Sequence, residues 1–293
     1  MPLLSNYITL LDPTVAAKPR HLAFYELGDR NNPDIVVCVH GLSRNGLDFE
    51  PLARALSAKY RVICPDMAGR GNSSWLANKN DYNYGVYCAD VIALLVQLGI
   101  GRVNWIGTSM GGIIGMMIAA GNPALIKKLV LNDVGAVVSA GGLKRIAGYI
   151  GTSGTFDSEE TATTYMKSIM STWGIETDEQ WRWMLEATFA KTPEGRYMLR
   201  YDSDISKPFR DAISAGVEIT DIDLSAFWNV IQCPTLILRG EVSDILTKKT
   251  ADAMCSRPGV TLKEIKGAGH APALLNTEQI TTIRDWLDNT RQC

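Results

Sequence analysis

The stretch RVNWIGTSMGGIIG, residues 102–115, decides how the rest of the chain is interpreted. Its apolar first part, residues 103–106, is typical of a short buried strand, and the small residues from Gly112 onward are compatible with a helix. Residues 107–111 (GTSMG) stand at the junction and fit G-x-S-x-G, the nucleophile elbow, in which a tight strand-to-helix turn presents a serine hydroxyl. Glycines are needed on both sides because larger side chains there would collide with neighbouring backbone. Ser109 is therefore the candidate nucleophile.

Size and charge exclude several classes of function. A chain of 293 residues can bury a full core and suggests one large domain or a domain with an insertion. Its net charge of −2 gives no electrostatic reason to expect nucleic acid or an anionic membrane as a partner. No apolar run approaches the roughly 20 residues needed to span a bilayer. Residues 1–7 lack the basic and apolar regions of a signal peptide, so we expect a cytoplasmic protein.

Cysteine and histidine usage argues against disulfides and metal sites. The cysteines are scattered without a C-x-x-C pair, which favours free thiols in a reducing compartment. With only His21, His40 and His270, the chain offers little scope for a metal cluster. We therefore expect neither a metal nor a cofactor. The six cysteines are Cys38, Cys64, Cys88, Cys233, Cys255 and Cys293.

On both sides of the opening stretch, predicted strands alternate with predicted helices. This alternation predicts a mostly parallel central sheet flanked by helices, with right-handed crossovers. The predicted strands cover residues 21–27, 35–39, 61–64, 103–106, 129–131, 235–238 and 260–265, and the predicted helices cover residues 49–58, 84–98, 112–120, 248–255 and 277–289.

The alternation is interrupted once. Roughly 100 residues separate the strand at 129–131 from the strand at 235–238, where the earlier crossovers need about 30 or fewer, and a structureless loop of that length is implausible. Helical patterns fall in this interval, together with Trp173, Trp181 and Trp183. We predict that residues 135–229 form a mostly helical cap over one edge of the sheet, and that residues 1–134 and 230–293 form the core.

A nucleophilic serine needs a base, and His270 is the candidate. It stands in a glycine-rich turn just past the last predicted strand, at the carboxyl edge of the sheet where Ser109 also lies. His21 lies at the amino end of a strand. His40 follows an inner strand and precedes Gly41, so we interpret it as a residue that holds the loop after this strand in place by hydrogen bonds.

Two carboxylates compete to orient the histidine. Asp244 follows the strand at 235–238, and its loop lies one strand before His270, which gives the chain order serine, aspartate, histidine. Asp133 follows the strand at 129–131 and reaches the same edge of the sheet. The sequence favours Asp244 and assigns Asp133 a capping or loop-pinning role, but it leaves this alternative open.

An oxyanion needs N–H donors that already point at it. The Met110 N–H, at the start of the helix after Ser109, is one candidate. The loop opened by His40 and Gly41 supplies the other, for which we name the Leu42 N–H.

Taken together, these motifs resemble the α/β-hydrolase superfamily over about residues 20–290. The resemblance implies an α/β-hydrolase fold with a helical cap inserted after the sixth strand. It also implies Ser109 as nucleophile, Asp244 as acid, His270 as base, and the Leu42 and Met110 amides as oxyanion hole. It is carried by His40-Gly41-Leu42, Asp66-Met-Ala-Gly69-Arg-Gly71-Asn-Ser73, residues 107–112, Asp244 and Gly269-His270.

Within that superfamily, serine at position 109 argues against haloalkane dehalogenases and epoxide hydrolases, which resemble this chain but use aspartate there. The lipase-like His-Gly-Gly-Gly run is absent, because Leu42 and Ser43 follow Gly41. The favoured function is a serine carboxylesterase that cleaves small or medium acyl esters or lactones through an acyl-enzyme. Cofactor-free perhydrolases share the same three residues.

Two further alternatives stay open. One is a C–C bond hydrolase of the meta-cleavage type, with Arg44 or a cap arginine holding the substrate acid. The other is a non-catalytic small-molecule receptor on the hydrolase scaffold. The cap aromatics Trp173, Trp181 and Trp183 either line an acyl pocket or pack the cap onto the core. The sequence does not indicate the oligomeric state.

Overall fold

The computed structural model describes residues 4–15, 17–152 and 154–289. Three of the residues on which the signal-peptide prediction rests, and Cys293, lie outside these ranges. Within them, no helix is both long enough and apolar enough to cross a membrane, and no group of three or more potential ligand side chains is arranged to hold a metal ion.

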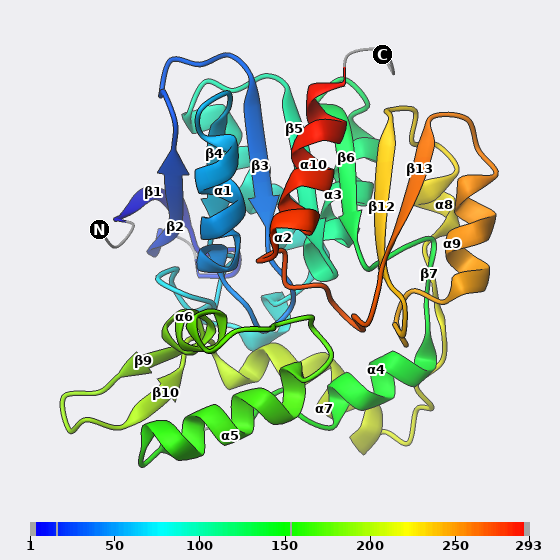
Figure 1. Ribbon diagram of the computed structural model, residues 1–293. Coiled ribbons are helices and arrows are strands. Elements are labelled where there is room, and N and C mark those ends of the chain that lie inside the picture. Colours follow the sequence, from blue (N-terminus) through cyan, green and yellow to red (C-terminus); the bar gives the residue numbers. More distant parts are fainter. Residues whose placement is uncertain (1–3, 16, 153, 290–293) are drawn as a thin grey trace.

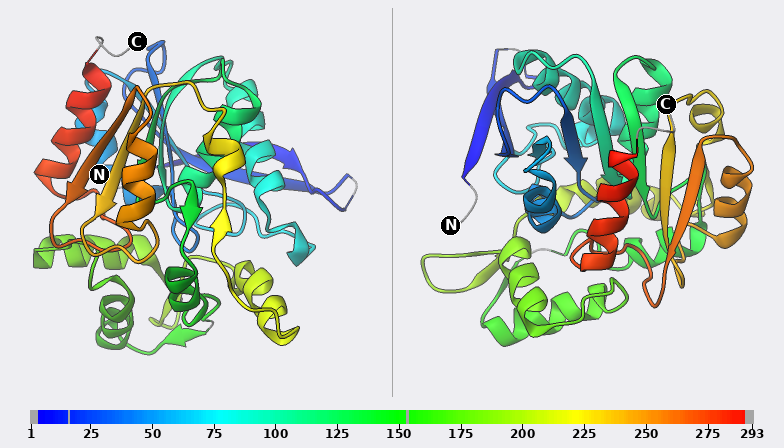
Figure 2. Two further views of the ribbon diagram at one scale, coloured as in Figure 1. Left: turned by 90° about the vertical axis from the view of Figure 1, so that its right-hand side faces the viewer. Right: turned by 45° about the horizontal axis from the view of Figure 1, so that its top comes forward.

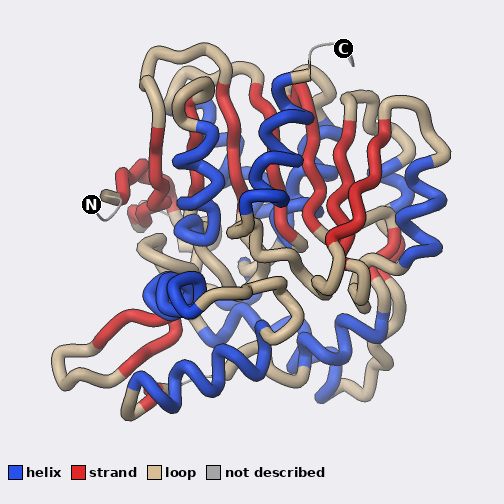
Figure 3. The backbone as a smooth tube through the Cα atoms, in the orientation of Figure 1, coloured by secondary structure: helices blue, strands red, loops and turns tan. Residues whose placement is uncertain are grey.

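An eight-stranded sheet forms the centre of the molecule, in the order β1-β2-β4-β3-β5-β6-β12-β13 (Figures 1 and 3). Strands β4 to β13 of this order run parallel, while β1 and β2 add an antiparallel edge. The inner strands are buried along their whole length, as expected for a sheet covered on both faces. The strands are β1 Ser5–Leu11, β2 Pro19–Leu27, β3 Ile35–Val39, β4 Arg61–Pro65, β5 Val103–Thr108, β6 Ile126–Asn132, β12 Thr235–Gly240 and β13 Val260–Ile265.

Helices cover both faces of this sheet (Figures 1 and 2). Helices α1 and α10 pack on one face, where Phe49, Leu52 and Trp286 join one apolar cluster. Helices α2, α3 and α9 lie on the other, whose larger cluster continues into the cap. The core helices are α1 Glu50–Leu56, α2 Tyr84–Gln97, α3 Met110–Gly121, α9 Lys248–Cys255 and α10 Thr277–Asp288, with short 3-10 turns η1 Gly46–Phe49 and η2 Lys79–Asp81.

Most of residues 135–229, which we call the cap, lies against the carboxyl edge of the sheet, while α8 (Ser225–Trp228) at the end of this segment packs against α3 (Figure 1). Five helices account for fewer than half of these residues, so the segment is less helical than predicted. Two small antiparallel sheets, β8-β10-β9 and β11-β7, were not predicted. Their strands are two or three residues long, too short for a periodic pattern. The elements are β7 Val137–Val138, α4 Ala140–Ala147, β8 Thr155–Phe156, α5 Glu159–Met170, α6 Asp178–Thr188, β9 Phe189–Lys191, β10 Tyr197–Leu199, η3 Ser203–Ser206, α7 Lys207–Ser214, β11 Ile222–Asp223 and α8 Ser225–Trp228.

The cap is tied to the core by polar contacts at several loops. The Asn45 side-chain amide donates to the Ala187 carbonyl at 2.7 Å, and the Ala273 N–H donates to the Trp173 carbonyl at 2.9 Å. An ion pair joins Lys79 to the cap carboxylate Asp202. These contacts hold the cap over the loops that carry the predicted site residues.

Candidate active site

Ser109 stands at a strained turn between β5 and α3. Its backbone has φ 51° and ψ −113°, a conformation that costs a non-glycine residue about 1–3 kcal/mol. A Cβ on Gly107 would lie 2.3 Å from the Gly111 carbonyl oxygen, and a Cβ on Gly111 would lie 1.9 Å from that of Val39. The two motif glycines therefore let strand and helix meet closely enough to form the predicted turn.

His270 links Ser109 to a buried carboxylate. Its Nε2 lies 2.9 Å from the Ser109 Oγ, and its Nδ1 lies 2.7 Å from the Asp133 Oδ2. The imidazole is 7% exposed and the carboxylate is fully buried. A hydroxyl, an imidazole and a carboxylate thus touch in series, with the serine O–H directed to Nε2 and the Nδ1–H directed to the carboxylate.

Asp133 is held by three donors. Its Oδ1 accepts the Gly240 N–H at 2.8 Å. Its Oδ2 accepts the Ser243 hydroxyl at 2.5 Å, in addition to the contact with His270. Ser243 in turn accepts the N–H groups of Ile245 and Leu246. These donors fix the Asp133 carboxylate in place beside the imidazole.

The prediction that Asp244 orients His270 is wrong, because Ser109 and Asp133 occupy both nitrogens of the imidazole. Asp244 is about 40% exposed and forms a two-point ion pair with Arg145 of α4, at 2.6 and 2.8 Å. The hydrogen bond from Arg145 holds the pKa of the Asp244 carboxyl below its usual range. The loop after β12 turns Ser243 inward toward Asp133 and leaves Asp244 facing the cap.

Asn132 connects the loops that carry these groups. It is fully buried at the end of β6, next to Asp133. Its side-chain amide donates to the Thr108 hydroxyl at 3.0 Å, beside the serine, and to the Pro272 carbonyl at 2.9 Å, beside the histidine. The sequence analysis did not single out Asn132 or Ser243, because the partners of each come from distant segments.

The two predicted oxyanion donors belong to segments that adjoin Ser109. Met110 is the first residue of α3, so its N–H has no partner within the helix and lies at the positive end of the helix dipole. Leu42 follows Gly41, where an added Cβ would be 3.8 Å from the Ser109 Cβ. The loop therefore lies against the serine, and donation by the two N–H groups stays a prediction.

His40 fixes the loop that bears Leu42, as predicted. It is fully buried, its Nδ1 lies 2.7 Å from the Gly41 carbonyl oxygen, and its Nε2 accepts the Met67 N–H at 2.9 Å. Both nitrogens are thereby used in a neutral ring. Burial lowers the pKa of His40 to about 3. His21, by contrast, is exposed on β2 with its ring against Tyr7.

This buried neutral histidine predicts a pH-dependent stability. Unfolding returns the pKa of His40 to about 6.5, so the unfolded chain takes up a proton that the folded chain does not bind until about pH 3. Stability is therefore lost as the pH falls through this window, by about 1.4 kcal/mol per pH unit from this group.

The variant His40→Gln keeps an acceptor for Met67 but cannot be protonated, so its unfolding free energy is expected to fall less steeply with acid. Denaturant unfolding of both proteins at pH 7, 6, 5 and 4 measures the difference. Parallel curves for the two proteins would contradict this account of His40.

Arg70 supports the same loop and was not anticipated from the sequence. Its guanidinium is fully buried, and its Nε–H donates to the Leu42 carbonyl at 2.8 Å. Nη1 donates to the Ala68 carbonyl at 2.6 Å and to the Tyr87 hydroxyl at 2.8 Å, while the cation lies 4.9 Å above the Tyr87 ring centre. In the sequence Arg70 is one charged residue in a glycine-rich turn, a context that normally indicates solvent exposure.

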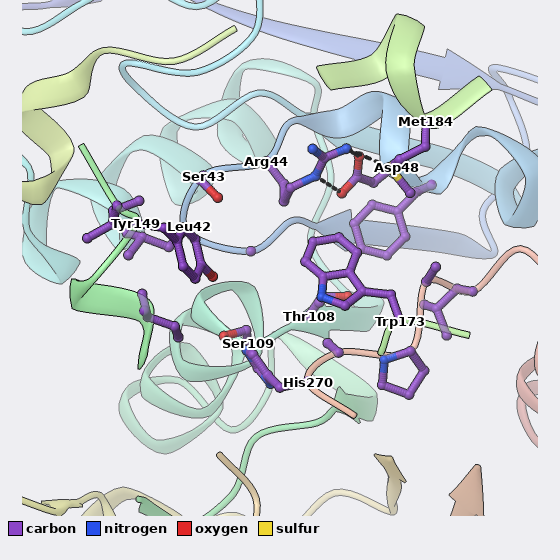
Figure 4. Close-up of a pocket in the computed structure, with 18 residues that line it drawn as sticks. Leu42, Ser43, Arg44, Asp48, Thr108, Ser109, Tyr149, Trp173, Met184 and His270 are labelled. Atoms are coloured by element: carbon purple, nitrogen blue, oxygen red, sulfur yellow. Dashed lines mark hydrogen bonds and ion pairs between the residues drawn. The ribbon is translucent and has the colours of Figure 1, made fainter. Parts of the chain in front are cut away.

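Two cavities open at Ser109. The smaller has a volume of about 50 Å³ and lies beside His270 and Trp173 (Figure 4). The larger has a volume of about 460 Å³ and extends along α3 beneath α4 and α7. Of the three tryptophans named as pocket candidates, Trp181 and Trp183 pack at the edge of the main apolar cluster, and Trp173 lines the smaller cavity.

Arg44 faces the smaller cavity, and its positive charge is balanced by the carboxylate of Asp48. It forms a two-point ion pair with Asp48, at 2.8 and 2.6 Å, and donates to the cap hydroxyl of Thr188 at 2.7 Å (Figure 4). It also lies 5.6 Å from the Trp173 ring centre. The arrangement joins core to cap, and it does not support the expectation that Arg44 holds a substrate acid.

Comparisons with known proteins show the family to which the chain is similar. A model described as the alpha/beta hydrolase family matches residues 36–280. A 3-hydroxybutyrate-oligomer hydrolase from Cupriavidus necator is 38% identical over 264 residues, which cover 88% of this chain and 90% of that protein. Two crystal structures are similar over nearly their whole length. A hydrolase from Rickettsia typhi has a TM-score of 0.88 and 35% identity, covering 98% of this chain and 99% of that one. An alpha/beta hydrolase from Novosphingobium aromaticivorans has a TM-score of 0.84 and 37% identity, covering 97% and 98%.

Proposed function

Because the chain belongs to the alpha/beta hydrolase family, we propose that it is a serine hydrolase that cleaves carboxylic esters through an acyl-enzyme. The observation that carries this proposal is the series of contacts from the Ser109 Oγ through His270 to the buried Asp133, at 2.9 and 2.7 Å. In this proposal Ser109 is the nucleophile, His270 the base, and Asp133 the acid that orients it.

In the first half of the reaction His270 Nε2 takes the proton of the Ser109 hydroxyl as the oxygen attacks the ester carbonyl. The carbonyl oxygen becomes an oxyanion and accepts the N–H groups of Leu42 and Met110. The Asp133 carboxylate stabilises the imidazolium that forms. The bond to the alcohol oxygen then breaks, and that oxygen takes the proton from Nε2.

In the second half a water molecule takes the place of the alcohol. It gives a proton to His270 Nε2 as its oxygen attacks the acyl carbon, and the proton returns to the Ser109 oxygen when the carboxylic acid leaves. Apart from this water, each step uses side chains and backbone N–H groups of the chain.

Two observations favour ester cleavage over the C–C hydrolase alternative. Arg44, the cavity arginine that would hold a substrate acid, is already paired with Asp48. The Cupriavidus relative is named for hydrolysis of 3-hydroxybutyrate oligomers, and units of a hydroxy acid are joined by ester bonds. Cofactor-free perhydrolases remain a subclass in which peroxide replaces water in the second half-reaction.

Pre-steady-state hydrolysis of p-nitrophenyl butyrate tests the proposal. We expect a burst of nitrophenol equal in amount to the enzyme, because p-nitrophenol is a good leaving group and the acyl-enzyme therefore forms faster than water hydrolyses it. A vinylogous diketone acid, offered under the same conditions, is expected to be cleaved far more slowly. Cleavage of the diketone without hydrolysis of the ester would favour the C–C hydrolase instead, and turnover of neither would favour a receptor.

A further inference from the structure

The two cavities at Ser109 differ in size and in their relation to His270. Ser109, Leu42 and Ile146 line both of them and so stand at their boundary. The smaller cavity continues from there past His270 to Trp173. The larger cavity turns the other way, along Met110 and the first turn of α3. A substrate whose carbonyl carbon sits at Ser109 therefore has one substituent on each side.

The position of the histidine decides which substituent is the alcohol. On cleavage the departing alcohol oxygen must receive the proton held at His270 Nε2, so that oxygen must lie within hydrogen-bond reach of this nitrogen. His270 lines the smaller cavity, whereas the serine end of the larger cavity is walled by Met110, Ile113 and Val134. The alcohol side of the ester is thereby directed into the smaller cavity, and the acyl side into the larger one.

The larger cavity has the surface of an acyl site. Its volume of about 460 Å³ is within the range of small-molecule sites. Its wall is mostly apolar, and each methylene of an acyl chain moved into it from water is expected to raise kcat/KM about fourfold. The smaller cavity, about 50 Å³, encloses a short alcohol, whereas a larger alcohol such as p-nitrophenol would extend beyond it. The apolar residues of the larger wall include Ile113, Val134, Val138, Leu143, Ile146 and Ile245.

We propose that the substrates are esters of medium-chain apolar acids with small alcohols, the acyl chain lying between α3 and the cap helices α4 and α7. The proposal rests on the esterase function proposed above and adds the direction in which the ester lies.

Two isomeric esters test this direction. Ethyl octanoate and octyl acetate have the same composition and differ only in which side of the ester bond carries the long chain. We expect kcat/KM, measured by titration of released acid below the solubility limit, to be at least tenfold higher for ethyl octanoate. Equal rates, or a preference for octyl acetate, would overturn the proposal and leave the esterase function intact. Hydrolysis of neither would overturn the esterase function and the proposal with it.

A matched pair of variants separates the two cavities. Val138→Phe narrows the larger cavity and is expected to lower the ratio of kcat/KM for ethyl octanoate to that for ethyl acetate at least tenfold. Ala273→Leu narrows the smaller cavity and is expected to lower the ratio of kcat/KM for ethyl octanoate to that for methyl octanoate. Thermal unfolding checks that both variants fold. If the two variants exchange these effects, the assignment of the cavities is reversed and the proposal fails; the isomeric esters test it in the unmodified protein in any case.

Discussion

Replacement of Asp133 by asparagine is expected to lower kcat for a short-chain ester by about four orders of magnitude. The Asp133 Oδ2 accepts from His270 Nδ1 at 2.7 Å and from the Ser243 hydroxyl. An asparagine that keeps its oxygen toward the Gly240 N–H turns its NH₂ group toward the imidazole. The ring must then present an unprotonated Nδ1 and a protonated Nε2, which cannot accept the Ser109 proton. Steady-state kinetics with p-nitrophenyl butyrate measure the loss.

Asp244→Asn is the matched control for this prediction, since it makes the same chemical change in the carboxylate that the sequence favoured. Asp244 is about 40% exposed and paired with Arg145, and such surface pairs contribute about 0–1 kcal/mol. We expect its kcat to stay within about twofold of the unmodified enzyme, because both imidazole nitrogens of His270 are bonded to Ser109 and Asp133 rather than to Asp244. A large loss in Asp244→Asn with full activity in Asp133→Asn would contradict the assignment.

Ser109→Ala is expected to lower kcat by about six orders of magnitude, because no other group on the chain replaces the attacking oxygen. The fold should persist, since the hydroxyl's hydrogen bond is to His270 and alanine occupies the same backbone conformation. Ester hydrolysis and thermal unfolding measure both effects.

The control for Ser109→Ala is Ser256→Ala at the exposed end of α9, where the hydroxyl bonds the Ala253 carbonyl. It is expected to keep full activity. Retention of esterase activity by Ser109→Ala, at a level above that of contaminating enzymes, would contradict the role of this serine.

The sequence was informative about the fold wherever a strand is buried on both faces. The α/β-hydrolase fold is confirmed by the family match and the structural neighbours. Strands β3 and β4 are continuous apolar runs, and the prediction places them within one residue of their observed ends. Strand β1 was missed because it alternates weakly at the sheet's edge, with Tyr7 about half exposed. Helices α4, α7 and α8 were missed although α1 and α9, which are equally short, were predicted. Helices α1 and α9 each connect two strands of the central sheet, so the strand-helix alternation indicates them, whereas α4, α7 and α8 lie where that alternation is interrupted.

The same logic explains which site residues could be predicted. Ser109 and His270 stand in glycine-rich junctions that mark sharp turns at the carboxyl edge. The choice between Asp133 and Asp244 depends on something a sequence does not encode locally, namely which way a side chain turns after its strand ends. Asp133 comes directly after β6 and has φ 57°, which turns it inward. Asp244 lies four residues beyond β12, past the inward turn made by Ser243.

The shapes of the two cavities were beyond sequence reasoning altogether. The larger is walled by residues from α2, α3, α4, α7 and the loops between them, and only their packing determines where space remains. Of the aromatic residues proposed as pocket candidates, Trp181 and Trp183 pack against the main apolar cluster, whereas Trp173 lines the smaller cavity.

The rate at which an organophosphonate labels Ser109 tests most directly whether His270, oriented by Asp133, activates this serine. Mass spectrometry identifies the modified peptide. We expect one adduct, on Ser109, which forms rapidly in the unmodified enzyme and in Asp244→Asn. In Asp133→Asn the adduct is expected to form at least a hundredfold more slowly, because the labelling rate depends on activation of the serine by the oriented histidine. Labelling at another residue, or equally fast labelling of Asp133→Asn, would contradict it.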